Sequence, residues 1–175
     1  IKKFNFFKTN ILKNYEYERN FPYKSQVSNL SPSIHFGEIS PLFIWNNIYK
    51  INNKNIFLNE ILWREFSYYL LNYYKNIYKE NFKTKFNNFP WKDNKFFDLW
   101  KYGKTGYPIV DAGMRELWET GYMHNRVRMI VASFLVKNLM IHWHKGRDWF
   151  WNTLLDADLA SNSFNWQWIA GSAAN

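Results

Sequence analysis

Apolar residues recur at helical spacing along most of the chain, and no segment alternates apolar and polar residues as a strand does. This spacing predicts a helix from Leu58 to about Tyr78 and a short helix from about Phe96 to Lys101. The first segment, up to about Tyr23, is polar and aromatic and is compatible with one more helix. The pattern as a whole predicts an all-α fold.

Proline and glycine mark helix ends in the second half of the chain. Pro108 stands where a first-turn proline belongs and Gly121 where a terminating glycine belongs, so a helix is predicted between them. The stretch from about Asn125 to Trp143 is apolar on most faces, which predicts a central helix. We expect Gly146 to end this region and another helix to run from about Arg147 to Leu155.

The length and the first residue indicate part of a larger protein. A chain of 175 residues is long enough for one domain with a core of its own. Because the chain begins with Ile1 instead of methionine, we expect residues 1–175 to be one partial helical domain.

Composition narrows the class of protein. The net charge of +9 suggests a polyanionic partner, although the abundance of lysine and asparagine is also typical of AT-rich coding DNA. The absence of cysteine excludes disulfides and thiolate metal sites. The longest apolar run, MIVASFLV, is far too short to span a membrane, and no signal-peptide pattern opens the chain. We expect a soluble bacterial-type cytoplasmic protein that acts as a monomer.

Polar residues follow a stripe near the C-terminal end. Asp158, Asn162 and Trp166 are spaced by four and would share one face of a helix, whereas Trp168 would point to nearly the opposite side. One face could thus address a cofactor and the other a second partner. A capping aspartate with core tryptophans would explain the same spacing.

A second group of polar residues lies in the predicted central helix. Asn125, Arg128 and Met129 would share a face, and an arginine that faces inward needs a carboxylate or an anionic ligand. An interhelical salt bridge is the simpler alternative to a ligand site. Arg126 lies off this stripe and is a candidate for a DNA phosphate contact.

A third group combines an aromatic ring with charged side chains. Glu60, Trp63 and Arg64 would lie on one side of a helix, where a large ring beside a carboxylate suits the recognition of a flipped base. Trp63 could instead belong to the core. His142 and His144 do not indicate a metal site, since residues two apart diverge on a helix.

Four short blocks occur in a fixed order: WREF at 63–66, TGYP at 105–108, MHNR at 123–126 and NWQW at 165–168. With these blocks the chain, from about Tyr15 onward, resembles the flavin-binding helical domain of the photolyase/cryptochrome family, and among its branches the class I cyclobutane pyrimidine dimer photolyases most. The resemblance implies FAD as cofactor, DNA containing pyrimidine dimers as partner, and light-driven dimer splitting by a carbon–carbon lyase. It also implies an N-terminal α/β domain and an antenna chromophore, a folate or a deazaflavin, which this sequence does not identify.

The resemblance assigns roles to individual residues, and it implies no metal. Expected catalytic and electron-path residues are Glu60, Asn162, Trp91, Trp143 and Trp166. Expected FAD contacts are Tyr15, Ser28, Ser31, Phe57, Arg64, Arg128, Asp156, Asp158 and Asn162, with Asp156 as the ion-pair partner of Arg128. Expected DNA or lesion contacts are Arg19, Glu60, Trp63, Asn125, Arg126, Met129 and Trp168. The chain departs from common family members at Val27, Asn29 and Phe57.

Two other functions fit parts of this pattern. A cryptochrome-type blue-light receptor would bind FAD without repairing DNA; Asn162 favours a photolyase, since plant cryptochromes tend to have aspartate there. A tryptophan-rich helical nucleic-acid binder without a cofactor is the third hypothesis, and the absence of flavin absorbance would identify it.

Overall fold

The computed structural model describes residues 1–173, which form helices and loops with no strand among them. The predicted all-α fold is therefore confirmed. The chain divides into two compact units, residues 1–66 and the part from Ser67 onward. The long helix α5 (Asn55–Tyr73) contains the boundary, and it is shorter at its C-terminal end than the sequence pattern predicted.

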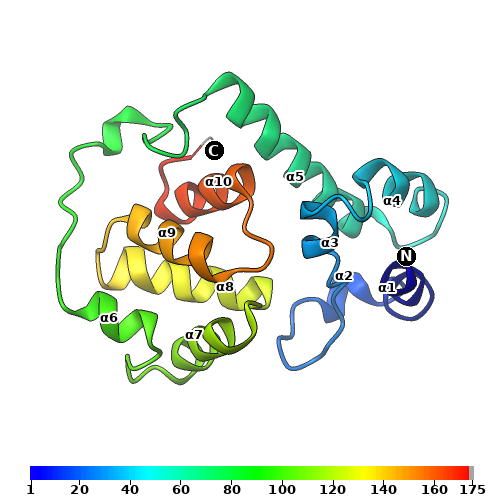
Figure 1. Cartoon of the computed structure of the whole chain (residues 1–175), viewed down its shortest axis with the longest axis horizontal. Coiled ribbons are helices and arrows are strands. Elements are labelled where there is room, and N and C mark those ends of the chain that lie inside the picture. Colours follow the sequence, from blue (N-terminus) through cyan, green and yellow to red (C-terminus); the bar gives the residue numbers. More distant parts are fainter. Residues whose placement is uncertain (174–175) are drawn as a thin grey trace. The chain divides into compact units, whose positions relative to one another are not determined.

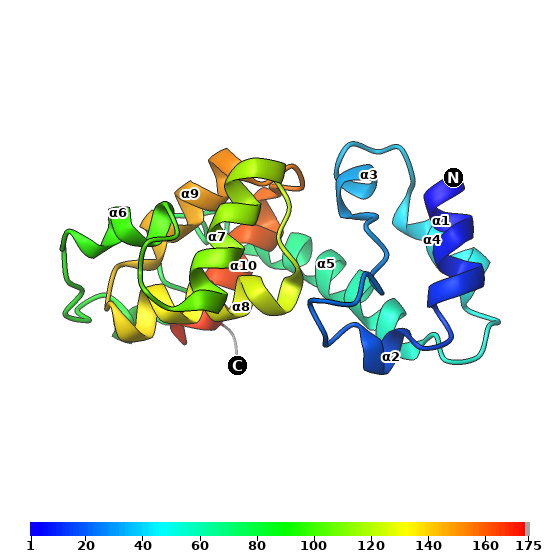
Figure 2. The same ribbon diagram turned by 90° about the horizontal axis from the view of Figure 1, so that it is seen from below.

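The first unit is made of short helices around a core of aliphatic and aromatic side chains. Its elements besides the start of α5 are α1 (Lys2–Phe6), a π-helical turn (Phe7–Ile11), α2 (Tyr15–Glu18), α3 (Ser31–His35) and α4 (Pro41–Ile48). The helices α1 and α4 lie side by side (Figures 1 and 2), and the rings of Phe4 and Phe43 meet edge to face at 5.6 Å. The single helix envisaged up to Tyr23 is thus three shorter elements.

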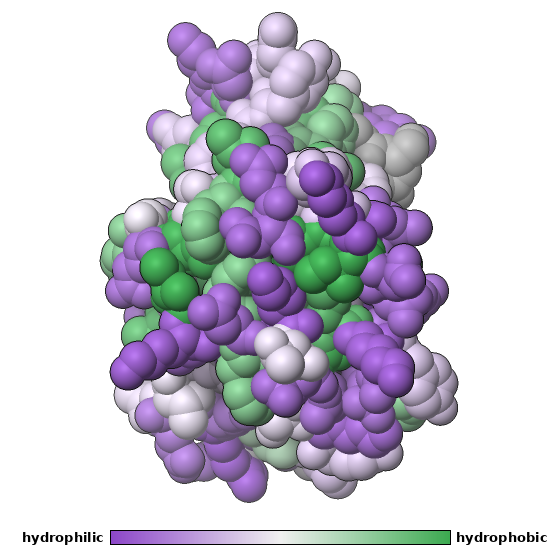
Figure 3. All heavy atoms as spheres, turned by 90° about the vertical axis from the view of Figure 1, so that its right-hand side faces the viewer, coloured by the Kyte–Doolittle hydropathy of each residue, from purple (hydrophilic) through white to green (hydrophobic). Residues whose placement is uncertain are grey.

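The outer face of the first unit is mostly hydrophilic. Figure 3 shows this face with hydrophobic patches separated by polar side chains. Lysines such as Lys3, Lys13 and Lys50 are exposed, so this part of the positive charge is solvated. No helix within residues 1–173 is long and apolar enough to cross a membrane.

The second unit packs its helices around a core that contains two fully buried tryptophans, Trp100 and Trp143. After α5 come a 3-10 turn (Thr84–Phe86), α6 (Phe96–Lys101), α7 (Pro108–Thr120), α8 (Asn125–Ser133), which continues as a π-helical turn (Phe134–Asn138), α9 (Trp143–Thr153) and α10 (Leu159–Ala170). Helix α8 contacts α7 and α10, and α10 also packs against α9 (Figure 1). The predicted ends of α7 are confirmed: Pro108 begins it, and Gly121 follows it with a φ of 68°.

The helix predicted from Asn125 to Trp143 was wrong beyond residue 138. Met140 has a φ of 55°, which cannot continue a right-handed helix, and a new helix begins at Trp143. The prediction that Gly146 ends a helix was also wrong, because Gly146 lies inside α9. A Cβ atom at this position would lie 2.1 Å from the ring of Trp166. Glycine stands there to let α9 and α10 approach each other.

Candidate functional site

The polar stripe on α10 begins with the aspartate that caps the helix. Asp158 accepts a hydrogen bond from the backbone N–H of Ser161 at 2.8 Å and another from the hydroxyl of Tyr68. The hydroxyls of Ser67 and Ser161 are 3.2 Å apart, so the same end of α10 contacts α5 twice. The cap and these contacts hold the Asp158 side chain in one place, and only 7% of the residue is exposed.

The two tryptophans of α10 lie on different sides, as their spacing predicted. Trp166 is 3% exposed and packs against Phe150 and Trp100, with ring centroids at 5.0 and 6.3 Å. Trp168 is 44% exposed. Asn162, one turn before Trp166, donates from its amide nitrogen to the carbonyl oxygen of Arg147 at 3.0 Å. Helix α10 therefore offers a buried face and an open face.

An ion pair connects α8 with the segment before α10. Arg128 donates to Asp156 at 3.0 Å and, through Nε, to the carbonyl oxygen of Met123 at 2.7 Å. The predicted partner of Arg128 is confirmed. The Asp156 side chain is only 7% exposed, and a buried carboxylate requires such a cation. Burial raises the pKa of the nearby Glu116, and the charge of Arg128 acts against that shift.

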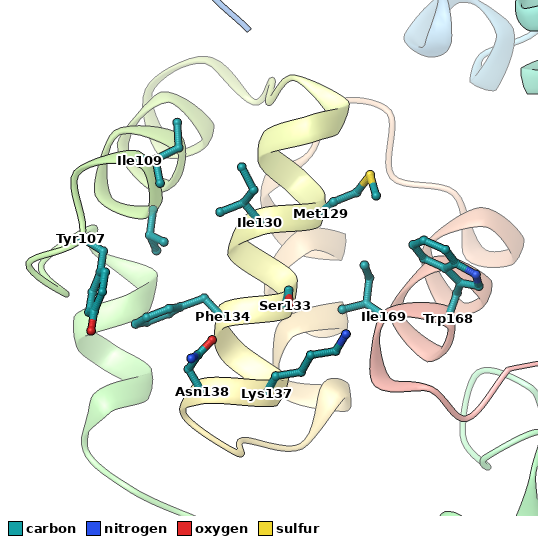
Figure 4. Close-up of a pocket in the computed structure, with 11 residues that line it drawn as sticks. Tyr107, Ile109, Met129, Ile130, Ser133, Phe134, Lys137, Asn138, Trp168 and Ile169 are labelled. Atoms are coloured by element: carbon teal, nitrogen blue, oxygen red, sulfur yellow. The ribbon is translucent and has the colours of Figure 1, made fainter. Parts of the chain in front are cut away.

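Met129 and Trp168 line the same pocket. It has a volume of about 470 Å³, and its wall includes Lys137 and the rings of Tyr107 and Phe134 (Figure 4). Its full lining is Tyr107, Ile109, Val110, Met129, Ile130, Ser133, Phe134, Lys137, Asn138, Trp168 and Ile169. An open apolar hollow with one lysine suits a flat, partly anionic ligand.

The remaining candidates on α8 stand at its start. Asn125 is exposed, and Arg126 points a guanidinium nitrogen at the sulfur of Met129, 3.4 Å away. The preceding residue, His124, accepts from the backbone N–H of Arg126 at 3.2 Å and so caps the helix. The MHNR block thus combines a helix cap with an asparagine and an arginine in the first turn of α8.

Three candidates of the first unit are linked by contacts. Glu60 pairs with Arg19, and the Arg19 guanidinium lies 5.4 Å from the ring centroid of Tyr15. Trp63 is 58% exposed and meets Phe66 edge to face, so the core alternative for Trp63 was wrong. An exposed indole close to a carboxylate is the arrangement that the helical spacing predicted.

Other expected FAD contacts in this unit differ in their surroundings. Phe57 and Tyr15 are buried, with ring centroids at 5.4 Å, whereas Arg64 pairs with Glu65 at 2.8 Å. Ser28 accepts from the backbone N–H of Leu30 at 3.4 Å.

The loop after Val27 explains one departure from the family pattern. Asn29 has a φ of 51°, and Ser31 then begins α3. Asparagine adopts this left-handed backbone more easily than other residues with a side chain, apart from aspartate. The local backbone therefore accounts for Asn29, and nothing in the structure explains Val27.

The three tryptophans of the expected electron path belong to the second unit. Trp143 is fully buried, donates to Asn81 at 2.9 Å and has the Arg147 guanidinium 5.3 Å from its ring centroid. The ring of Trp166 packs against Gly146, which lies about one turn after Trp143 in α9. Trp91 contacts His142, with ring centroids at 5.1 Å.

The two histidines beside Trp143 do not diverge, contrary to expectation. Their ring centroids are 4.3 Å apart, because His142 precedes α9 as its N-cap and is not helical. Burial lowers the pKa of both, with that of His144 at about 4. No group of three or more histidine or acidic side chains that could hold a metal occurs in the described part of the chain.

Sequence reasoning missed two residues that hold loops in place. Gln167 is fully buried; it donates to the carbonyl oxygens of Ile77 and Glu80 and accepts from the N–H of Phe82 at 2.8 Å. Asp111 accepts from the backbone N–H groups of Thr105 and Gly106 at 2.8 and 2.9 Å. A glutamine between two tryptophans and an aspartate in the first turn of a helix were the available signals.

These candidates fall into two groups that belong to different units of the chain. One group belongs to residues 1–66 and includes Glu60 and Trp63; the other belongs to the second unit and includes Asn162, Met129 and Trp168. A joint role of the two groups in one site stays a prediction.

Comparisons with known proteins agree with this geometry. The family model described as "FAD binding domain of DNA photolyase" matches residues 57–175. A deoxyribodipyrimidine photo-lyase from Agrobacterium fabrum is 52% identical over 171 residues, which is 94% of this chain and 36% of that protein. Cryptochrome-2 from Arabidopsis thaliana is 43% identical over 162 residues, covering 85% of this chain and 26% of that protein.

A solved photolyase structure has the same fold as this chain. The crystal structure of a bacterial class III photolyase from Agrobacterium tumefaciens superimposes with a TM-score of 0.94 at 50% identity, covering 99% of this chain and 37% of that one. Its class differs from the class I branch that the motifs favoured, so the branch stays a prediction. The chain spans little more than a third of the length of these photolyases. It belongs to the family of the FAD-binding domain of DNA photolyase.

Proposed function

We propose that the protein carrying this chain is a deoxyribodipyrimidine photo-lyase, which splits cyclobutane pyrimidine dimers in DNA with light. The observation that carries the proposal is the two-sided helix α10. One side presents Asp158 at the N-cap, the half-buried Asn162 and the buried Trp166, and the other side presents Trp168 at the wall of a pocket that also contains Met129. A cofactor would contact the side with Asp158 and Asn162, and a lesion would contact the side with Trp168.

The donor set of the second unit fits a flavin. Flavin rings need hydrogen-bond donors and acceptors along one edge, and Arg128, Asp156 and Asn162 supply a guanidinium, a carboxylate and an amide. The positive charge of Arg128 would favour a reduced, anionic ring. Bound FAD would supply light-driven one-electron chemistry. These three residues would orient the ring and set its charge.

The lesion would be held by aromatic surfaces and cations. Trp168 and Trp63 are both partly exposed indoles on which a flipped base can stack, and stacking stabilises binding by about 1 to 3 kcal/mol per base. Glu60 would accept a hydrogen bond from a thymine edge, with Arg19 holding the carboxylate in place. Arg126 and Lys137 would meet phosphates.

A cryptochrome-type receptor is the second candidate, and the similarity to Arabidopsis cryptochrome-2 favours it. Both candidates bind FAD and use the same buried face of α10. They differ in whether the lesion side is used. Asn162, where plant cryptochromes tend to have aspartate, supports the photolyase.

The proposal is tested with the purified protein, its flavin chemically reduced with dithionite. An oligonucleotide with one thymine dimer should be repaired under blue light and should stay unrepaired in darkness. If illumination gives no repair in a sample whose absorbance proves that reduced flavin is bound, the photolyase proposal is overturned in favour of the receptor. A protein without flavin absorbance would indicate the cofactor-free nucleic-acid binder.

A further inference from the structure

The imidazole of His142 lies between two of the tryptophans of the expected electron path. Its ring centroid is 5.1 Å from that of Trp91 and 5.8 Å from that of Trp143. No direct ring contact joins these two indoles within residues 1–173. The run of ring contacts from Trp91 to Trp143 therefore passes through a histidine.

The position of this ring is fixed by the start of α9. His142 has an extended backbone (φ −56°, ψ 132°), and its Nδ1 accepts from the backbone N–H of His144 at 3.1 Å. A nitrogen that accepts carries no proton, so the neutral ring has its proton on Nε2. The helix cap thus sets both the orientation and the tautomer of His142.

The segment that carries Trp91 is tied to the same loop. The N–H of Lys92 donates to the carbonyl oxygen of Met140 at 2.8 Å, and the Asn94 amide donates to that of Leu139 at 3.2 Å. Asp93 pairs with Lys145 of α9 at 2.5 Å. These three contacts hold Trp91 against His142.

Charge around Trp143 favours electron flow toward it. The Arg147 guanidinium lies 5.3 Å from the Trp143 ring centroid and pairs with the exposed carboxylate of Asp148 at 2.6 Å, while its Nη1 is buried without a hydrogen-bond partner in the described residues. Because the carboxylate that compensates this cation is exposed to solvent, the nearby guanidinium still disfavours a second positive charge on the indole. A radical cation on Trp143 would therefore be quickly reduced by any donor coupled to it.

We propose that His142 is the bridge through which Trp91 reduces Trp143 during light-driven recharging of the flavin. The inference rests on the proposed function and names the residue that links two steps of its electron path. One electron leaves Trp91 and reaches the Trp143 radical cation, so Trp91 is oxidised, Trp143 is restored, and no bond forms or breaks. An added thiol returns the electron to Trp91. His142 carries no charge and acts as a positioning residue.

A pair of substitutions separates the bridge from the cap. His142→Phe keeps an aromatic ring and loses the Nδ1 acceptor, whereas His142→Asn keeps a good N-cap acceptor and loses the ring. The bridge predicts that only His142→Asn slows the electron transfer. The cap predicts the opposite order in thermal stability, with His142→Phe melting at a lower temperature.

The measurement is transient absorption of tryptophan radicals after a laser flash on the protein with oxidised flavin. Trp91→Phe defines the lifetime of the Trp143 radical without onward transfer, and His142→Asn should approach that lifetime. His142→Phe should keep wild-type kinetics. The matched control is His144→Asn, because His144 contacts Trp143 at 4.1 Å and has no ring contact with Trp91.

Wild-type kinetics in His142→Asn would overturn the bridge, and so would slow transfer in His142→Phe alone. Repair by dithionite-reduced protein should be equal in all these variants, because a reduced flavin needs no recharging. Lost repair with intact radical transfer counts against the photolyase alone. The absence of any tryptophan radical in the wild type would overturn the bridge and the electron path together.

Discussion

Two polar segments of the second unit carry the family motifs, and they use their polar groups differently. Around Asp111 the polar groups form a closed network within the protein: the carboxylate accepts from both the N–H and the hydroxyl of Thr105 and from the N–H of Gly106. The segment from Asp156 to Trp168 has an ion pair and a capped helix, yet it ends in an indole that is 44% exposed. A motif can thus mark a structural loop or a surface that stays open to solvent.

Asp111→Ala should produce the largest effect on stability. It removes the acceptor of two backbone N–H groups and a hydroxyl, so we expect the free energy of unfolding to fall by about 3 kcal/mol. Chemical denaturation measures the change. Asp98→Ala is the control, because its side chain is 70% exposed and its pair with Lys101 should contribute less than about 1 kcal/mol. Equal losses in both variants would mean that the closed network adds nothing.

Trp166→Phe should abolish photoreduction of the flavin while leaving repair by chemically reduced protein intact. The reason is that recharging needs a path through the protein, whereas repair needs only flavin and lesion. Flavin absorbance during illumination and a dimer-repair assay measure the two processes. Trp118→Phe, at an exposed and stacked indole, is the control. If repair is lost as well, Trp166 has a structural role instead.

Trp168→Ala should weaken binding of a dimer-containing oligonucleotide by about 1 to 3 kcal/mol and leave the flavin content unchanged. Fluorescence anisotropy with damaged and undamaged DNA measures the difference. Trp151→Ala is a matched control, since Trp151 is 48% exposed and lies outside the pocket. An equal loss of affinity for both DNAs would remove Trp168 from lesion recognition.

Acid should destabilise the second unit through its histidines. Burial, His142 and Arg147 lower the pKa of His144 from 6.5 to about 4, so the folded state binds fewer protons than the unfolded state between these values. The contribution of His144 to the free energy of unfolding should therefore be constant above pH 6.5 and should decrease as the pH falls toward 4. Denaturation at several pH values measures it, and His144→Asn should flatten that part of the curve. An unchanged curve would mean that His144 titrates normally.

Local patterns in the sequence determined much of this fold. Helix α7 has its predicted ends because proline fixes the first turn and glycine adopts the left-handed backbone at Gly121. The positions of Asn162, Trp166 and Trp168 on α10 follow from helix geometry, and Asp158 precedes them as the N-cap. These properties depend on neighbours within one or two turns.

Only the tertiary structure decided where distant segments meet. Gly146 continues a helix because the ring of Trp166, from another helix, takes the space of a side chain. The break near Met140 makes His142 an N-cap and brings it against Trp91, a residue from a segment about fifty positions earlier. Gln167 can be buried because the loop carbonyl oxygens of Ile77 and Glu80 accept hydrogen bonds from its amide nitrogen. Such contacts join residues far apart in the chain, and no local spacing encodes them.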